Sequence, residues 1–329
     1  MKTKCRALSF SIMTTLSLTL AVVLFTVYAP ARAQTFPEKG KTITFIVAFP
    51  AGSGSDTSAR LMVPHLEKHI GVPVRIVNKP GAGGQIGATE LAKAAPDGYT
   101  IGLTNLPNLI QFYLNPERKA TFNGASFQLL ATNNDEPACL IVRSDSPFRS
   151  AKDVMEAIKK TPDTIKAGTS GRDAFDHTFG KVLERHNGGS FRYVHFEGSG
   201  KSMVALLGGH TDIMPTSIGL LGSAGKTRQA RMIAVADASR NPLFPDVPTF
   251  KEQGYDITFS VTRIVSMPAG APKEVVNALA KALRAAITDP EHSAKAKAAG
   301  MELVYRGPKE STAFWQQREQ LVKKLMSAK

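Results

Sequence analysis

Four loops rich in glycine and serine carry the residues of this sequence that could do chemistry. Each loop follows an apolar run with strand character and leads directly into a helical pattern. Glycine lets backbone N–H groups approach an anion closely, and a helix N-terminus adds unpaired donors and a positive dipole end. Such loops suit a carboxylate better than a neutral ligand. They span residues 50–56, 80–84, 169–171 and 198–200.

Any one of these loops has an ordinary explanation, because glycine and serine are common turn and capping residues. Four of them in the same topological position favour ligand binding, since open α/β sheets bind ligands beyond the carboxyl ends of their strands. His177, with Asp176, opens a predicted helix, where a capping role and a ligand contact both remain open. The candidate ligand-binding residues of the loops are Ala51, Gly52, Ser53, Gly54, Asp56, Gly81, Ala82, Gly83, Gly84, Thr169, Ser170, Gly171, Gly198 and Ser199.

The sequence contains no complete motif for binding a nucleotide cofactor. The segment Gly200-Lys201-Ser202 resembles the end of a phosphate-binding loop, but His195 stands where that motif requires glycine. A dinucleotide-binding fingerprint would need a third glycine at Ile86 or at Thr57. We therefore expect no nucleotide or other cofactor.

Catalytic motifs are also lacking. No G-x-S-x-G sequence is present to supply a hydrolase nucleophile. His65 and His69 share one helix face, but Leu66 replaces the glutamate of a zinc protease, so we interpret both histidines as solvated. Cys139 lies in an apolar strand and is interpreted as a core thiol. These patterns predict neither a catalytic residue nor a metal ligand.

The N-terminus is typical of an export signal. Positive residues precede an apolar stretch over residues 8–27, and Ala31-Arg32-Ala33 forms a small-x-small cleavage site. We expect residues 1–33 to be a signal peptide cleaved near Ala33, placing the mature protein in the periplasm; a membrane anchor is the alternative. Removing Lys2, Lys4, Arg6 and Arg32, four cations and no acid, lowers the formal charge from +14 to +10.

The remaining positive charge does not indicate a nucleic-acid-binding protein. Lysine and arginine are scattered, and no basic run is interleaved with aromatic residues. We interpret the remaining positive charge as a general attraction for small anions. We therefore expect no nucleic-acid partner.

Strand-like and helical patterns alternate along the chain, which is typical of βαβ units and of an α/β fold with a mostly parallel sheet. The predicted strands are residues 42–49, 72–77, 99–104, 138–143, 164–168, 191–196, 212–215, 231–236 and 258–267. The predicted helices are residues 55–70, 85–95, 151–160, 174–186, 201–208, 273–288 and 309–326.

The length of the mature chain favours two domains. Because no long linker divides them, we expect strands to cross between them twice. The first domain would comprise residues 34–137 and 237–329, and the second residues 138–236. The crossover strands would lie near 138–143 and 231–236.

The sequence resembles the tripartite tricarboxylate transporter receptors, also called Bordetella uptake gene (Bug) proteins. The resemblance runs in order through nearly all of the mature chain. It rests on residues 43–60 around Phe49-Pro50-Ala51-Gly52, on residues 78–87 and 96–100, and on residues 206–212, 245–249 and 268–270.

The resemblance implies a two-domain periplasmic binding protein of the Venus-flytrap type, expected here to be monomeric. Such a receptor delivers a small organic carboxylate, such as a di- or tricarboxylate or an aromatic acid, to a two-component membrane permease. The family's first-domain loops, here 50–56 and 80–84, hold a carboxylate through backbone amides and ordered water. Its second-domain loops, here 169–177 and 196–202, close over the rest of the ligand.

Three departures from the family pattern bear on the ligand. The family commonly has a lysine where this chain has Glu197, and a serine-rich run where it has Arg172 and Asp173. A Trp-x-Gly segment is replaced by residues 262–264, which include Arg263. Arg172 and Arg263 could pair with a second carboxylate in a bidentate fork and so favour a diacid, or they could be solvated surface charges.

Ligand capture followed by domain closure is therefore the predicted function. An exported enzyme acting on carboxylated or phosphorylated small molecules is the alternative, although no nucleophile, base or metal set converges in the loops. An adhesin or other interaction module is a third interpretation.

Overall fold

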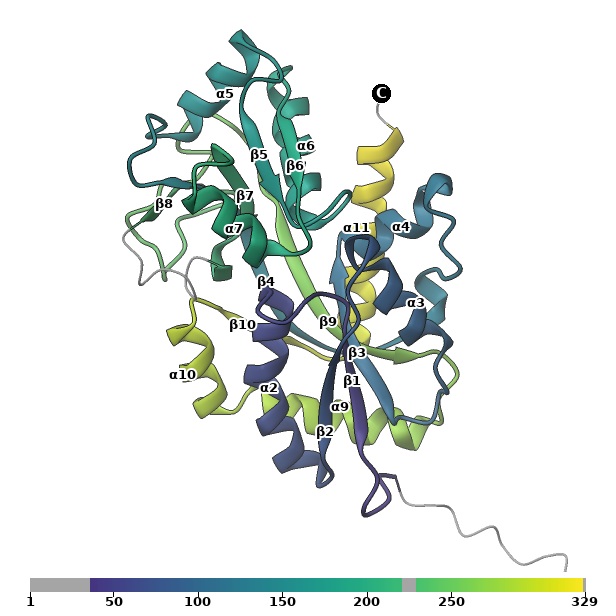
Figure 1. Cartoon of the computed structure of the whole chain (residues 1–329). Coiled ribbons are helices and arrows are strands. Elements are labelled where there is room, and N and C mark those ends of the chain that lie inside the picture. The colour runs from purple at the N-terminus through teal and green to yellow at the C-terminus, as the bar shows by residue number, and fades with distance from the viewer. Residues whose placement is uncertain (1–35, 221–228, 328–329) are drawn as a thin grey trace, which may run out of the picture. The chain divides into compact units, whose positions relative to one another are not determined.

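The computed structural model describes residues 36–220 and 229–327 (Figure 1). The predicted signal peptide, residues 1–33, lies outside this range. Within the described residues, no helix has both the length and the apolar character needed to span a bilayer. Two groups of packed elements, called here the first and the second lobe, share the two strands β4 and β9.

The first lobe is built on a mixed sheet. Strand β1 pairs in parallel with β2 and with β3, and β9 then runs antiparallel to both β3 and β4. Strand β10 pairs antiparallel with β4 at Thr132 and Asn134. The strands are β1 (Ile43–Val47), β2 (Val74–Asn78), β3 (Thr100–Leu106), β4 (Phe127–Arg143), β9 (Ser260–Pro268) and β10 (Leu303–Arg306).

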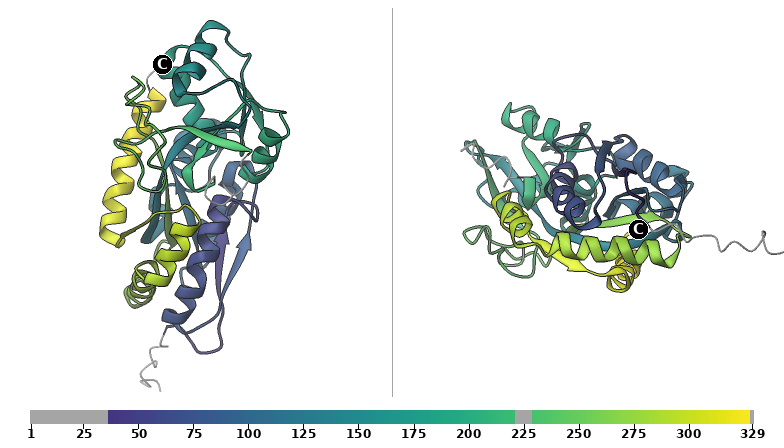
Figure 2. Two further views of the ribbon diagram at one scale, coloured as in Figure 1. Left: turned by 90° about the vertical axis from the view of Figure 1, so that its left-hand side faces the viewer. Right: turned by 90° about the horizontal axis from the view of Figure 1, so that it is seen from below.

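Helices cover this sheet on both faces. The helices are α2 (Gly54–Ile70), α3 (Gln85–Lys93), α4 (Asn108–Leu114), α9 (Lys273–Ile287), α10 (Pro290–Ala298) and α11 (Pro308–Ser327). Short 3-10 turns lie at η1 (Ala82–Gly84), η2 (Pro116–Arg118) and η3 (Gly124–Ser126). The long helix α11 packs against β4 and α4 and runs along one side of the molecule in Figure 2.

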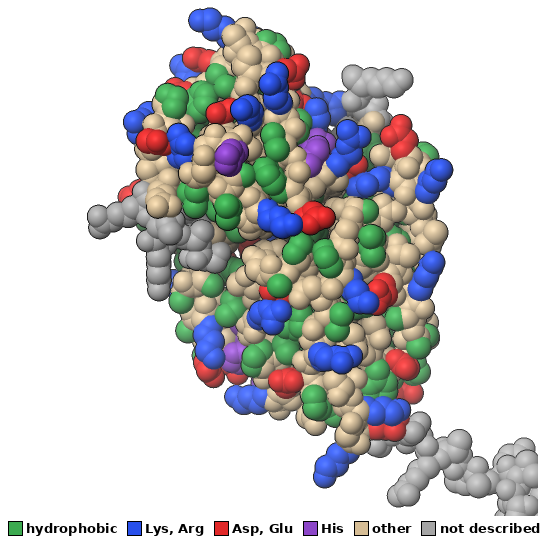
Figure 3. Space-filling view, viewed as in Figure 1, with side chains coloured by type: hydrophobic (Ala, Val, Ile, Leu, Met, Phe, Trp, Pro, Cys, Tyr) green, Lys and Arg blue, Asp and Glu red, His purple; other side chains and the backbone are tan. Residues whose placement is uncertain are grey.

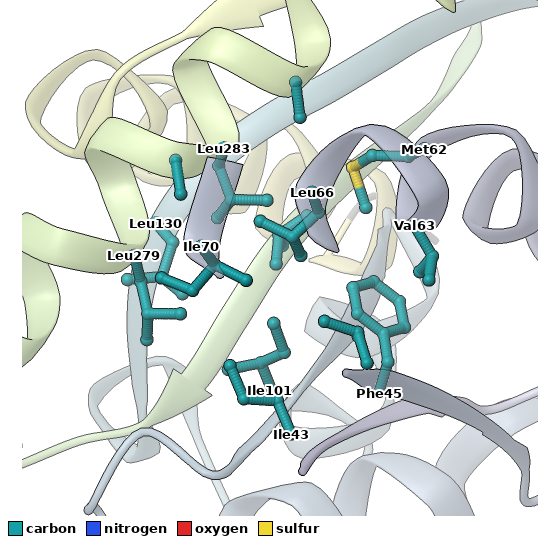
Figure 4. Close-up of a cluster of buried hydrophobic side chains, with 14 of the residues drawn as sticks. Ile43, Phe45, Met62, Val63, Leu66, Ile70, Ile101, Leu130, Leu279 and Leu283 are labelled. Atoms are coloured by element: carbon teal, nitrogen blue, oxygen red, sulfur yellow. The ribbon is translucent and has the colours of Figure 1, made fainter. Parts of the chain in front are cut away.

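Helix α2 forms because its sequence supplies both ends and one apolar face. Ser53 caps its N-terminus by accepting a hydrogen bond from the Asp56 N–H, and Gly71 ends it in the left-handed conformation. Its Met62 and Leu66 are buried against Phe45 and against α9 (Figure 4). Burying each such side chain contributes about 1.5–3 kcal/mol, which fixes the helix axis and hence the position of its N-terminus.

The second lobe repeats the parallel pattern on a smaller scale. Strand β5 pairs in parallel with β6 and β7, while the end of β4 runs antiparallel to β7 and β8. Its elements are α5 (Ala151–Lys160), β5 (Lys166–Thr169), α6 (Phe175–Asn187), β6 (Arg192–His195), α7 (Ser199–Leu207), β7 (Ile213–Ser217) and β8 (Ala230–Val235). A separate apolar core, which includes Leu140 and Phe179, holds it together.

Strands β4 and β9 belong to both lobes. The first half of β4 pairs with β9, and its second half pairs with β7 and β8. Phe250 and Phe259, which follow residue 236, pack into the core of the second lobe. This packing favours β9, rather than the segment 231–236, as the strand that leads the chain back to the first domain. The division into two domains itself stays a prediction.

The sequence did not predict α4, α10, β10 or residues 127–137 of β4. The α/β class is nevertheless as expected. Parallel pairing holds within β2-β1-β3 and within β6-β5-β7, and the antiparallel pairs involve β4 and β9. Lysine and arginine side chains are spread among acidic and apolar ones on the face shown in Figure 3, without one basic patch there.

Candidate ligand-binding site

Two hollows lie where the predicted loops of both lobes meet. The first, called the inner cavity, has a volume of about 50 Å³. It is lined by Phe49, Ser53, Gly54, Ser55, Asn105, Asn108, Ser170, Phe175, Asp176, Ser199, Thr216, Ser217, Leu220, Val261 and Arg263. The N-termini of α2, α6 and α7 therefore border one space, as the loop pattern predicted.

The second hollow, called the outer cavity, has a volume of about 420 Å³. Its lining residues are Ala48, Phe49, Pro50, Pro80, Gly81, Ala82, Gly83, Gly84, Arg118, Ser170, Gly171, Arg172, Phe196, Glu197, Gly198 and Lys201. Phe49 and Ser170 line both hollows, so the two are neighbours along the junction of the lobes.

Asp56 supports the N-terminus of α2 without lining either cavity. Its Oδ2 accepts hydrogen bonds from the Gly52 N–H at 2.9 Å and from Arg60 at 2.8 Å, and its Oδ1 accepts one from Asn78. Burial alone would raise the pKa of Asp56, but the donors from Arg60, Gly52 and Asn78 lower it below the usual value. The carboxylate is thus occupied within its own loop.

The first N–H groups of α2 remain available to a ligand. Gly54 and Ser55 are the first helical residues, and such positions have no acceptor one turn earlier within the helix. Both residues line the inner cavity, where the positive end of the helix dipole favours an anion. The geometry at this helix end therefore suits an anion such as a carboxylate, and its role in ligand binding stays a prediction.

A titratable carboxyl group, that of Asp176, lies in the same cavity. Its oxygens accept hydrogen bonds from the Ser170 N–H at 2.6 Å and from the His177 N–H at 2.9 Å. Burial raises the pKa of Asp176 to about 6, although the two N–H donors act to lower it. Asp176 therefore carries a negative charge at neutral pH that it loses in mildly acidic solution.

Glycines allow the two lobes to approach closely. A side chain at Gly83 would meet the backbone oxygen of Arg172 at 2.9 Å, and φ at Gly83 is +71°. A Cβ at Gly198 would lie 3.1 Å from Pro50, with φ at +97°. Both positions need glycine because its backbone reaches this conformation and leaves room for the facing lobe.

Arg118 links the lobes directly. Its Nη2 donates hydrogen bonds to the carbonyl oxygens of Ala82 in the first lobe and Arg172 in the second, at 3.3 and 3.2 Å. Its Nε lies 3.3 Å from Asp173 Oδ2, forming an ion pair. A further contact joins Thr178 to Gln111 at 2.9 Å. These contacts join the two lobes, and Arg118 also lines the outer cavity.

Arg263 is buried and lines the inner cavity, so the interpretation as a solvated surface charge is wrong for this residue. Its Nη1 donates to Glu136 Oε1 at 2.6 Å, and its Nε donates to the Ser55 hydroxyl at 3.3 Å. Arg172 differs, because it is exposed and borders the outer cavity. The two arginines therefore do not share one wall of a single pocket.

Most of the predicted site residues line one of the cavities, and five do not. Ala51 and Gly52 are exposed at the tip of their loop, and Asp56 supports that loop. The hydroxyl of the buried Thr169 lies 2.6 Å from Nδ1 of His195, which packs edge-on against His177. The Nδ1 of His177 accepts a hydrogen bond from the Asp173 N–H at 3.0 Å, which favours the supporting role for this histidine.

Sequence reasoning missed Asn105 and Asn108. Both are buried, and three of their four amide atoms have no hydrogen-bond partner among the described residues: Asn105 Oδ1 and both polar atoms of Asn108. The remaining Nδ2 of Asn105 donates to Ser55. Asn105 directly follows the predicted third strand, so the rule that ligands bind beyond the carboxyl ends of strands could have found it.

The chain is similar to a known family of receptors and to known members of it. Residues 58–329 match the tripartite tricarboxylate transporter family receptor, TctC. Protein BugT of Bordetella pertussis is 28% identical over 264 residues, which cover 75% of this chain and 76% of BugT.

Solved structures give the same result. The periplasmic binding protein BugD is 29% identical, with a TM-score of 0.79 over 87% of this chain and 98% of BugD. MatC from Rhodopseudomonas palustris, solved with bound malate, is 26% identical, with a TM-score of 0.80 over 86% of this chain and 98% of MatC. These likenesses confirm the expected α/β periplasmic binding protein fold. The resemblance found in the sequence is thereby confirmed, and the chain belongs to the tripartite tricarboxylate transporter receptor (TctC) family.

Proposed function

We propose that this protein captures a small organic carboxylate in the inner cavity and delivers it to the two-component permease of a tripartite tricarboxylate-type transporter. The observation that carries the proposal is the meeting of three helix N-termini, from both lobes, around one cavity that also holds the Arg263 guanidinium. Because its members are solute-binding receptors, the family is not one of enzymes, and this chain is a binding protein.

A dicarboxylate is the substrate class that the cavity supports best. The α2 N-terminus offers N–H donors for one carboxylate, and Arg263, within hydrogen-bond distance of Ser55 in that same helix, offers a guanidinium. The malate bound by MatC is a ligand of this class. An aromatic acid or a tricarboxylate would require a wider space between the same groups.

Ligand access requires the lobes to separate. The inner cavity, at about 50 Å³, is small for a dicarboxylate. A dicarboxylate contacting both lobes would then be enclosed as they close again, and these contacts would drive the closure. The contacts of Arg118 with the second lobe belong to the closed state.

The decisive experiment is a thermal-shift screen of the purified mature protein against a library of carboxylic acids, with turnover measured for every hit. A raised melting temperature without product formation is expected. Product formation would instead support an exported enzyme, and the absence of any small-molecule shift would support an interaction module. Calorimetric titration of Arg263→Ala with the best diacid then tests the role of Arg263, because unchanged affinity would remove this residue from the ligand site.

We also propose that the protein reaches the periplasm as a monomer after cleavage near Ala33. The export pattern of residues 1–33 and the periplasmic location of BugD support this location. N-terminal sequencing of the periplasmic protein should give a chain that begins at Gln34. An intact N-terminus in the membrane fraction would favour an anchor instead.

A further inference from the structure

A cluster of histidine and acidic side chains lies between α2 and α10, away from the ligand cavities. His65 Nδ1 lies 3.4 Å from Asp289 Oδ2, and His69 Nε2 lies 4.0 Å from the same oxygen. Ligand atoms of His65, Asp289 and Glu291 lie within 4.8 Å of one another. His65 is buried rather than solvated, because its ring stacks on His292 at a centroid distance of 5.2 Å.

We propose that His65, His69 and Asp289 bind a divalent transition-metal ion such as Zn²⁺, with Glu291 as a fourth ligand. Imidazole nitrogens and carboxylate oxygens are the ligand types that Zn²⁺ prefers outside thiolate sites. A tetrahedral ion with bonds of about 2.0–2.1 Å separates its ligand atoms by roughly 3.3 Å. The separations of 3.4 and 4.0 Å between Asp289 Oδ2 and the two imidazole nitrogens are close to that value.

The two carboxylate oxygens of Asp289 have different partners, and this difference supports the site. Its Oδ1 caps α10 by accepting hydrogen bonds from the N–H groups of Glu291 and His292 at 2.8 and 3.3 Å. Its Oδ2 faces the two imidazoles and the ammonium of Lys68, which lies at 3.6 Å. One carboxylate oxygen is therefore fixed by the backbone, and the other is directed at the cluster.

His292 forms one wall of the cluster, behind His65. Its Nδ1 lies 2.9 Å from the Ala286 carbonyl oxygen, which can only accept, so the ring donates its Nδ1 proton there. The ring is thereby fixed where it stacks on His65.

The site is reachable from solvent through its exposed side. Glu291 and Lys68 have side chains 64% exposed, and His69 is 31% exposed. Lys68 now supplies the positive charge next to Asp289 Oδ2, so a metal ion must displace its ammonium. His65 follows Gly54 by eleven residues, about 16 Å along the axis of α2, so the ion would clamp α10 onto α2 without touching the carboxylate cavity.

Calorimetric titration of the mature protein with zinc chloride, in a buffer free of chelators, tests the proposal. One saturable site per chain is expected, with a melting temperature about 5 °C higher at a hundredfold excess over Kd. His69→Ala should weaken binding at least about tenfold, since it removes a ligand. Asp289→Asn should do the same, although asparagine can still cap α10.

Two further variants separate a metal site from a purely structural network. Lys68→Met should strengthen zinc binding by about two- to tenfold, because it removes the competing ammonium; in a structural ion-pair network it would only lower stability. His210→Ala, at an exposed histidine of the second lobe, should leave zinc binding unchanged. The proposal is overturned if zinc does not saturate one site, or if His69→Ala and Asp289→Asn bind zinc as the parent chain does.

Discussion

Arg263 and Glu136 form a buried ion pair beside the inner cavity, with Nη1 of the arginine 2.6 Å from Oε1 of the glutamate. Their side chains are only 4% and 1% exposed, and they come from β9 and β4, the two strands shared by the lobes. The same Oε1 accepts a hydrogen bond from Asn134, whereas Oε2 has no partner among the described residues. The buried guanidinium of Arg263 therefore already has one carboxylate partner, with which a bound anion would share it.

Removing one member of this pair should destabilise the protein strongly. We expect Arg263→Met to cost about 3–5 kcal/mol of unfolding free energy, because it leaves Glu136 as an uncompensated buried charge. The double variant Arg263→Met with Glu136→Leu should recover most of that loss, since neither charge remains. Urea unfolding of the three proteins measures both effects, and a double variant no more stable than the single one would contradict the ion-pair argument.

The N-terminus of α2 can be tested with a matched pair of glycine substitutions. A Cβ at Gly54 would lie 2.9 Å from Nη2 of Arg263 and would occupy the inner cavity. A Cβ at Gly200, in the first turn of α7, would meet nothing within 4 Å, and neither glycine has a positive φ. We expect Gly54→Ala to weaken carboxylate binding at least about tenfold, which is about 1.4 kcal/mol.

Gly200→Ala is the control for that substitution. It should leave affinity within about twofold and stabilise the fold by up to about 1 kcal/mol, because alanine is the better helix former. Calorimetry with the best carboxylate measures affinity for both variants. Equal affinities would show that the N-terminus of α2 is not the ligand-binding element.

The contact of Arg118 with Asp173 should set how readily the lobes open. Asp173→Asn removes the ion pair, and asparagine tolerates the positive φ of 59° found at this position. We expect a larger radius of gyration for the ligand-free variant in small-angle scattering and an affinity about two- to tenfold lower. Removing the negative charge of Asp173 would by itself strengthen the binding of an anion near the cavities. A loss of affinity would therefore point to the lost contact between the lobes.

Asp145→Asn is the matched control, since Asp145 pairs with Arg143 on the exposed surface of the second lobe. Exposed pairs contribute little, so this variant should keep both its radius and its affinity. If Asp145→Asn and Asp173→Asn behave alike, the contact of Arg118 does not hold the lobes together.

The loops at strand ends were predictable from the sequence because they are local features. Glycine and serine between a strand and a helix fix both the turn and the free N–H groups, and Ser53 and Gly54 indeed line the inner cavity. Helix α2 was found to within one residue for the same reason, since its cap and its apolar face are contiguous in the chain.

The parts that were missed depend on contacts between distant residues. Strand β4 begins at Phe127, and its first half is recognisable only through its pairing with β9, more than a hundred residues later. Arg263 could not be placed from its neighbours in sequence, because Glu136 decides where its guanidinium points. His65 was interpreted as solvated, since helical spacing gave no sign that α10 would cover it.

The carboxyl group of Asp176 should make ligand binding depend on pH. Its pKa of about 6 means that it is mostly ionised at pH 7.5 and mostly protonated at pH 5. An anion in the same cavity disfavours the ionised form and raises this pKa further, so binding near pH 6 takes up a proton. We expect affinity to fall about three- to tenfold between pH 5.5 and 7.5 for a ligand that is fully ionised over that range.

The same group affects folding in a direction that can be worked out. The native state holds the Asp176 proton up to about pH 6, whereas the unfolded chain loses it near the ordinary value of 3.8. Between these values the native state binds more protons, so the contribution of this group to stability is largest below pH 4 and declines until pH 6. Asp176→Asn should remove this decline and also the proton uptake on ligand binding. Calorimetry in buffers of different ionisation enthalpy measures the uptake, and an identical value in Asp176→Asn would assign the proton to another group.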